Sequence, residues 1–111
     1  MGSFTKSPTN LTELQVDGTT VVVDETNDRV GIKTDAPRDA LDVAGNVVPH
    51  TNASHDLGSA TYRWNNMYTN DLHLANDRGD YTIVEEEEYL SIRNNKSGKL
   101  YKFVLEEIPE D

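Results

Sequence analysis

The apolar residues of the chain fall into short, evenly spaced clusters, and no cluster sustains a helical period over three turns. Between the clusters lie Gly, Asn and Asp, which tolerate the positive φ angles of tight turns. This pattern predicts an all-β fold made mainly of short strands and tight turns. The clusters cover residues 21–23, 30–32, 41–43, 47–48, 72–74, 81–84, 89–92 and 100–105.

Two short helical turns are expected as exceptions to the strand pattern. Asp35 can cap one turn, with Pro37 near its start, and Ser59 can cap another that carries the residues from Tyr62 to Met67. Neither stretch is long enough for a regular helix.

The last third of the chain predicts a hairpin whose second strand is apolar on both faces. Alternation places Tyr101, Phe103 and Leu105 on one face and Leu100 and Val104 on the other. Such a strand requires cover on both sides, which favours burial in an assembly.

A pattern in the first half recurs after 27 residues, because Leu14, Val16 and Gly18 match Leu41, Val43 and Gly45. Two copies of a repeat cannot bury a continuous core alone, since about three or more are normally required. Other copies of the chain wound around one axis would supply the missing neighbours.

The composition points to the same need for partners. Leu, Ile, Val and Phe supply only 25 of the 111 residues, just above the share of roughly 20% below which disorder is expected. Without Cys, no disulfide can compensate for a sparse core. We expect a flexible N-terminal segment over 1–13, an intertwined fibre-repeat region over 14–76 and a C-terminal hairpin or tip region over 77–111.

The formal charge of −10 opposes binding to nucleic acid or to an anionic membrane. No stretch of roughly 20 apolar residues predicts membrane insertion, and no signal-peptide pattern is present. Export by this sequence is therefore not expected.

Two stretches in the middle of the chain carry more specific patterns. The first runs from Asp28 to Val47 and contains Val-Gly-Ile, a Pro five residues later and Leu-Asp-Val-Ala-Gly-Asn; the second runs from Val48 to Leu72 and contains Pro, Asp-Leu-Gly-Ser, Arg-Trp and Met-Tyr. In order and spacing they resemble two adjoining elements of bacteriophage tail-fibre and appendage proteins. Residues 80–85 and 94–107 resemble the end of structural proteins of marine myovirus-type phages.

The resemblance implies an elongated, intertwined homotrimer that forms a shaft or tip reaching towards the host. It also implies location in the virion, synthesis in the host cytoplasm, and contacts with other fibre or baseplate proteins. Many such fibres end in a self-cleaving chaperone with a Ser-Lys dyad. Ser91 and Lys96 have its separation, but Ile92 and Asn95 depart from its pattern, so we expect no cleavage and no enzyme activity.

The candidate site residues are therefore mainly packing residues. We expect the trimer core to contain Leu14, Val16, Val30, Ile32, Leu41, Val43, Leu57, Trp64, Tyr68, Leu72 and Leu74. In an alternative reading the chain is a receptor-recognition tip, where exposed aromatic rings stack on host-surface glycan. That site would consist of Tyr62, Trp64, Asn65, Asn66 and Tyr68.

Other candidate chemistry carries less weight. His50, His55 and His73 have no metal-ligand spacing, and the carboxylates of Glu85 to Glu88 would alternate between the faces of a strand. We therefore expect neither a metal nor a cofactor. A polysaccharide depolymerase is the least favoured function, because no nucleophile and base stand out as a pair.

Overall fold

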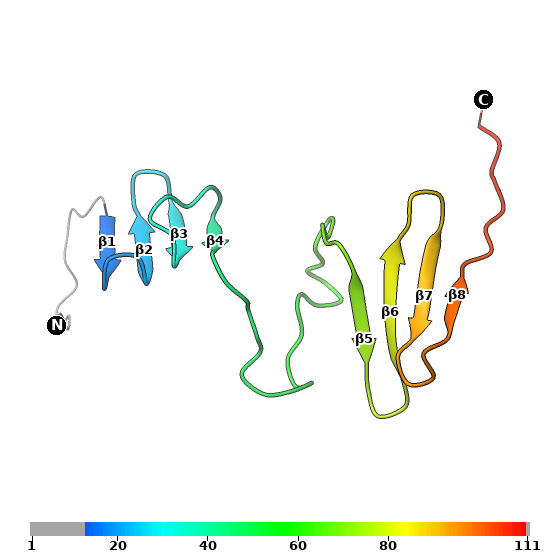
Figure 1. Ribbon diagram of the computed structural model, residues 1–111. Helices are drawn as coiled ribbons and strands as arrows, with labels where there is room; N and C mark the ends of the chain where they lie inside the picture. The colour runs from blue at the N-terminus through cyan, green and yellow to red at the C-terminus, as the bar shows by residue number, and fades with distance from the viewer. Residues whose placement is uncertain (1–12, 111) are drawn as a thin grey trace. The chain divides into compact units, whose positions relative to one another are not determined.

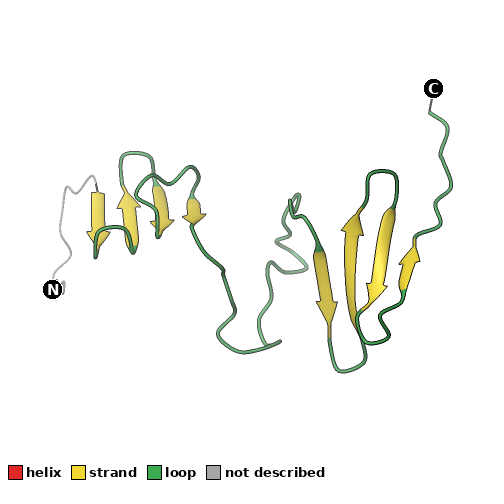
Figure 2. Cartoon of the chain, viewed as in Figure 1, coloured by secondary structure: helices red, strands yellow, loops and turns green. Residues whose placement is uncertain are grey.

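A computed structural model describes residues 13–110, which form eight strands and no helix (Figures 1 and 2). The expected N-terminal segment, 1–13, lies outside the described residues except for Glu13. The chain divides into two units, Met1–Leu57 and Gly58–Asp111. Each unit contains one four-stranded sheet, so the all-β prediction is confirmed.

The sheet of the first unit, called sheet 1 below, has the strand order β1-β2-β3-β4. The first three strands are antiparallel neighbours, whereas β3 and β4 pair in parallel. A parallel pair requires a crossover, and residues 33–40 provide it. The strands are β1 (Glu13–Val16), β2 (Val21–Asp24), β3 (Arg29–Ile32) and β4 (Leu41–Val43).

The turns of sheet 1 use the residues that the sequence offers for positive φ. Asp17 and Gly18, with φ of 50° and 74°, lie between β1 and β2. In the turn between β2 and β3, Asp28 has a φ of 56°, and both carboxylate oxygens of Asp24 accept hydrogen bonds from Asn27. Short polar side chains bond locally in this way and so favour a turn over a longer strand.

The crossover of residues 33–40 covers one face of sheet 1. A Cβ atom added at Gly31 would lie 2.3 Å from the Thr34 carbonyl oxygen, so the crossover passes directly over β3. Arg29 donates to the Pro37 carbonyl at 3.4 Å, and the Pro37 ring is buried. The same face carries Val22, which is fully buried.

The sheet of the second unit, called sheet 2 below, is an antiparallel meander with the order β5-β6-β7-β8. Its turns again depend on Asn: the Asn76 side chain accepts from the backbone of Arg78 and Gly79, and Asn94 accepts from Lys96 and Ser97. The strands are β5 (Leu72–Ala75), β6 (Asp80–Glu85), β7 (Leu90–Asn94) and β8 (Leu100–Lys102).

The two helical turns expected from the sequence are absent, and this part of the prediction was wrong. Asp35 and Pro37 lie in the crossover instead. Ser59 accepts a hydrogen bond from the Tyr62 backbone at 3.0 Å, as a helix cap would. However, the Ser59 amide donates to the Tyr62 carbonyl at 2.9 Å. This reciprocal pair folds the chain back on itself, whereas a helix would continue forward.

The boundaries differ in two places from those expected. The division between the units falls at Leu57, ahead of residue 76, because β5 pairs with β6 and belongs to sheet 2. The last strand ends at Lys102, so the residues from Phe103 to Glu110 have no regular structure. Only the Phe103 amide continues the ladder, by donating to the Leu90 carbonyl.

We predict that Gly31→Ala destabilises the first unit by roughly 1–3 kcal/mol, because the added methyl group would overlap the Thr34 carbonyl. Gly45→Ala is the matched control, since its nearest neighbour is a flexible Lys33 methylene at 3.7 Å. Thermal or denaturant unfolding measures both. Equal stabilities of the two variants would contradict the close passage of the crossover over β3.

Candidate assembly surface

One face of sheet 1 consists entirely of apolar side chains. Residues opposite each other in a ladder share a face, and so do alternate residues along a strand. The registers therefore align two apolar rows, each crossing all four strands. One row is Leu14, Val23, Val30 and Leu41, and the other is Val16, Val21, Ile32 and Val43.

This apolar face of sheet 1 has no complete cover. None of its eight side chains is buried, and the exposed fraction reaches 61% at Leu41. The only fully buried hydrophobic side chain in residues 13–110 is Val22, which lies on the opposite face beneath the crossover. This opposite face, called the mixed face below, carries Gln15, Val22, Gly31 and Asp42. The crossover covers the mixed face, whereas the apolar face is open.

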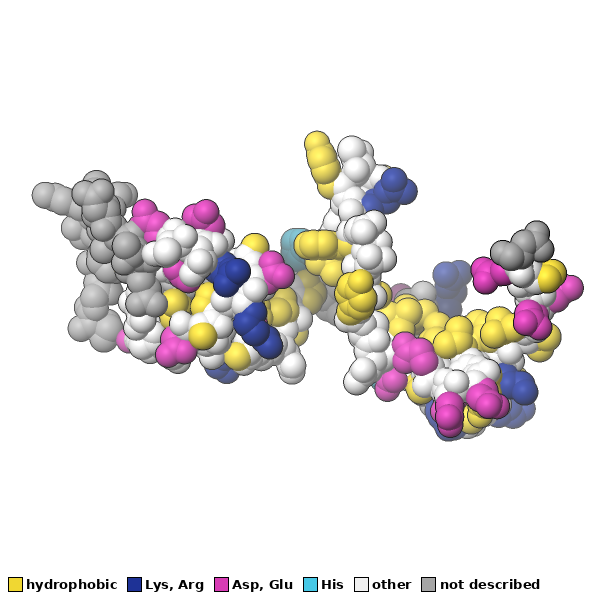
Figure 3. Space-filling view, turned by 90° about the horizontal axis from the view of Figure 1, so that it is seen from above, with side chains coloured by type: hydrophobic (Ala, Val, Ile, Leu, Met, Phe, Trp, Pro, Cys, Tyr) yellow, Lys and Arg dark blue, Asp and Glu magenta, His cyan; other side chains and the backbone are white. Residues whose placement is uncertain are grey.

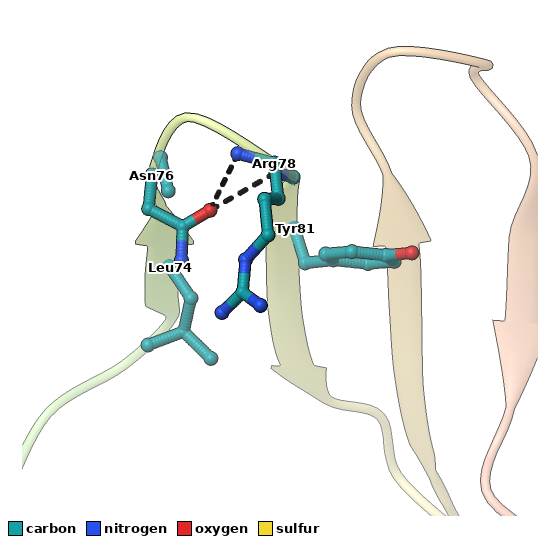
Figure 4. Close-up of a pocket in the computed structure, with 6 residues that line it drawn as sticks. Leu74, Asn76, Arg78 and Tyr81 are labelled. Carbon is teal, nitrogen blue, oxygen red and sulfur yellow. Dashed lines mark hydrogen bonds between the residues drawn. The ribbon is translucent and has the colours of Figure 1, made fainter.

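Sheet 2 also has an open face of mainly apolar side chains. Its registers place seven apolar residues on one face, none of them buried, and Figure 3 shows hydrophobic side chains in a band over this unit. Near the β5–β6 turn, Leu74, Tyr81 and Arg78 line a shallow cavity of about 340 Å³, with the Arg78 side chain extending between the other two (Figure 4). The seven residues are Leu72, Leu74, Tyr81, Ile83, Leu90, Ile92 and Tyr101.

Residues 44–71, called the connecting segment below, join the two sheets without forming a strand. Every residue of the connecting segment is exposed. Seven of them carry large apolar side chains that are between 63% and 92% exposed: Val47, Val48, Leu57, Tyr62, Trp64, Met67 and Tyr68.

A single compact turn holds Trp64 in place within the connecting segment. Ser59 and Tyr62 exchange the two hydrogen bonds described above. Gly58 has a φ of 86°, and a Cβ atom added there would lie 3.5 Å from the indole ring of Trp64. The ring therefore packs along the Gly58 backbone and presents the rest of its surface to solvent.

The predicted site residues are distributed over three surfaces. Six of the predicted core residues share the apolar face of sheet 1, and Leu72 and Leu74 share that of sheet 2. Leu57, Trp64 and Tyr68 lie on the connecting segment, as do the predicted glycan contacts. Asn65 and Asn66 are exposed and lie between Trp64 and Tyr68 in the sequence.

Sequence reasoning missed several members of these faces. Val21 and Val23 complete the rows of sheet 1, and Tyr81, Ile83 and Ile92 lie in the centre of sheet 2. Strict alternation within the apolar clusters would have found them. The run of three Val residues hides that alternation, because Val22 is apolar although it lies on the opposite face.

The other candidate groups are engaged in local structure. His73 hydrogen-bonds to Thr82 across the β5–β6 pair. Instead of alternating along a strand, the acidic run continues past Glu85 into a turn, where the Glu86 amide donates to the Tyr89 carbonyl. No cluster of three or more metal-ligating side chains occurs in the part of the chain that the structure describes.

Ser91 and Lys96 bond to different groups. The Ser91 hydroxyl, 2% exposed, donates to the Glu86 carboxylate at 3.0 Å. The Lys96 ammonium donates to the Arg78 carbonyl at 3.3 Å. The two side chains therefore do not pair with each other.

Comparison of the chain with protein-family models, curated proteins and solved structures finds no match. None of the described residues belongs to a helix with the length and apolar character needed to cross a membrane.

An ion pair fixes the crossover to the mixed face of sheet 1. Arg38 donates to both carboxylate oxygens of Asp42, at 2.8 and 3.2 Å, and its amide donates at 3.0 Å. The side-chain hydrogen bonds from Arg38 lower the pKa of Asp42, and the backbone hydrogen bond adds to this. The charged carboxylate is thus favoured in the folded chain.

We predict that Arg38→Ala raises the pKa of Asp42, which NMR titration of the carboxyl carbon measures. Because the folded pKa is lowered, the pair contributes stability above the ordinary Asp value, and this contribution is lost as the pH falls towards the folded pKa. Arg63→Ala, in the connecting segment, is the control and should leave the titration unchanged. An unshifted Asp42 in the Arg38 variant would contradict the ion pair.

Proposed function

We propose that the chain is a structural segment of a bacteriophage tail fibre or related virion appendage, assembled as a homotrimer that contributes to a shaft or tip used in host attachment. The observation that carries this proposal is the pair of sheets with unpartnered apolar faces. Apolar surface of this extent costs free energy in water until another surface covers it.

The lack of burial within each unit supports a permanent assembly. The open faces of the two sheets carry fifteen apolar side chains, none of them buried, and Val22 is the only fully buried hydrophobic side chain in residues 13–110. Covering these faces requires other surfaces. Subunits of obligate assemblies often have no stable folded monomer.

Several residues of the two elements that resemble phage fibres set the local path of the backbone, which supports a structural role. In the first element, the crossover passes close to Gly31 at Thr34, Pro37 is buried, and Asp42 forms an ion pair with Arg38. In the second, Gly58 accommodates the ring of Trp64, and Ser59 closes the turn with Tyr62. Each of these residues thus acts on the path of the backbone.

Within this proposal the partners are two further copies of the chain together with neighbouring fibre or baseplate proteins in the virion. The acidic surface suits such an exposed position, because a large net charge keeps an assembly soluble. The function then lies in assembly and needs no bound cofactor.

Mass measurement in solution tests the proposal, and we expect a trimer at micromolar concentration. Leu41→Asp should abolish the trimer and its cooperative unfolding together, because it places a charge in the proposed core. In a monomer the same change would cost little, since Leu41 is already 61% exposed.

Ala40→Asp is the matched control, because Ala40 is exposed, directly precedes Leu41 and lies outside the apolar rows. It should leave the trimer intact. A wild-type monomer, or a Leu41→Asp variant that still assembles as a trimer, would contradict the proposed function.

A further inference from the structure

The connecting segment presents seven large apolar side chains to solvent. Loops longer than about 12–15 residues without secondary structure are uncommon in compact domains and are often functional. Here all of residues 44–71 are exposed, and Tyr68 is 92% exposed. These exposed apolar side chains are therefore available to a partner of their own.

The part of the connecting segment around Trp64 has the composition of a protein interface. The cores of such interfaces are enriched in Tyr, Trp, Met and Arg and depleted in Lys, Glu and Asp. Residues 62–68 contain two Tyr, one Trp, one Met and one Arg, and none of the depleted types. Val48 and Leu57, earlier in the segment, are exposed as well.

The low charge of the connecting segment favours a second copy of the chain as the partner. The chain has a net charge of −10, so copies repel each other wherever their acidic residues meet. The only charged residues of the connecting segment are Asp56, Arg63 and Asp71. The segment therefore carries about one tenth of the net charge of the chain over a quarter of its length. Two copies can approach here with little repulsion.

Trp64 is also held ready for binding. Its ring rests on Gly58, and the hydrogen-bonded turn between Ser59 and Tyr62 fixes the chain that leads to it. An aromatic ring that is ordered before binding loses less conformational entropy when it docks, which makes it an effective interface anchor.

We propose that Trp64, flanked by Tyr62 and Tyr68, is the anchor by which the connecting segment of one copy docks onto an adjoining copy. This inference rests on the proposed homo-oligomeric function and deepens it by naming the interface. The anchor acts through burial of the ring, since an aromatic side chain removes roughly 150–250 Å² from water.

The chain contains a single Trp, so its fluorescence reports directly on this position. In the single chain the Trp64 side chain is 67% exposed. We expect the assembled protein to show blue-shifted emission and protection from acrylamide quenching. We also expect Trp64→Ala to weaken association by about 30-fold or more, as for an interface hot spot.

Asn66→Ala is the matched control, because Asn66 is exposed in the same segment and the change removes no aromatic ring. Asn66→Ala should preserve both the mass of the assembly and the blue-shifted Trp emission. Trp64→Phe should retain most of the association, which separates the need for a ring from a general effect on folding. Circular dichroism checks that each variant keeps its strands.

The possible failures are distinguishable. A trimer whose Trp64 stays open to acrylamide would overturn the anchor and leave the proposed function standing, and loss of glycan-array binding in Trp64→Ala would then favour a receptor-binding tip. Equal association of Trp64→Ala and wild type would also overturn the anchor. A monomer at every concentration would overturn the anchor and the proposed function together.

Discussion

The structure depends on one constraint: each four-stranded sheet has two faces, and the chain covers only part of them. Within sheet 1 the crossover of residues 33–40 closes the face of Val22, and this closure requires a Gly at position 31. The apolar rows on the other face remain open. Hydrogen bonding is therefore largely satisfied within a unit, whereas hydrophobic burial is not. Because net stability is a small difference between large terms, a sheet with one uncovered face is marginal by itself.

The same distinction between backbone geometry and apolar burial applies to the residues of the two sequence elements, 28–47 and 48–72. Their Gly, Pro, Ser and Asp residues set the path of the backbone through turns, a close approach and an ion pair. The apolar residues between them, such as Val30 and Leu41, face away from that local structure. One set of positions thus builds the unit, and the other forms the open apolar face that the proposed assembly would cover.

Much of the fold could be predicted from residue patterns. Seven of the eight apolar clusters became strands, and the expected turn residues Asp17, Gly18 and Asp28 have positive φ. The helical turns were wrong because a cap residue such as Ser59 also closes a tight turn, and only the direction of the next hydrogen bond distinguishes the two. The grouping of six predicted core residues on one face could not be derived beforehand. It depends on the register between β3 and β4, where a shift of one residue would move Leu41 and Val43 to the other face.

Under the proposed assembly, the distribution of charge limits how copies of the chain can meet. In the second unit, the acidic residues concentrate in the turn from Glu86 to Glu88 and in the tail from Glu106 to Glu110, whereas the apolar face of sheet 2 carries mainly uncharged side chains. Repulsion between copies is then weakest where the gain from burial is greatest, so the two effects favour the same contacts. Salt screens the repulsion between exposed carboxylates but leaves hydrophobic burial largely intact. Assembly driven in this way should tighten as ionic strength rises, which is the reverse of the behaviour of an interface built on opposite charges.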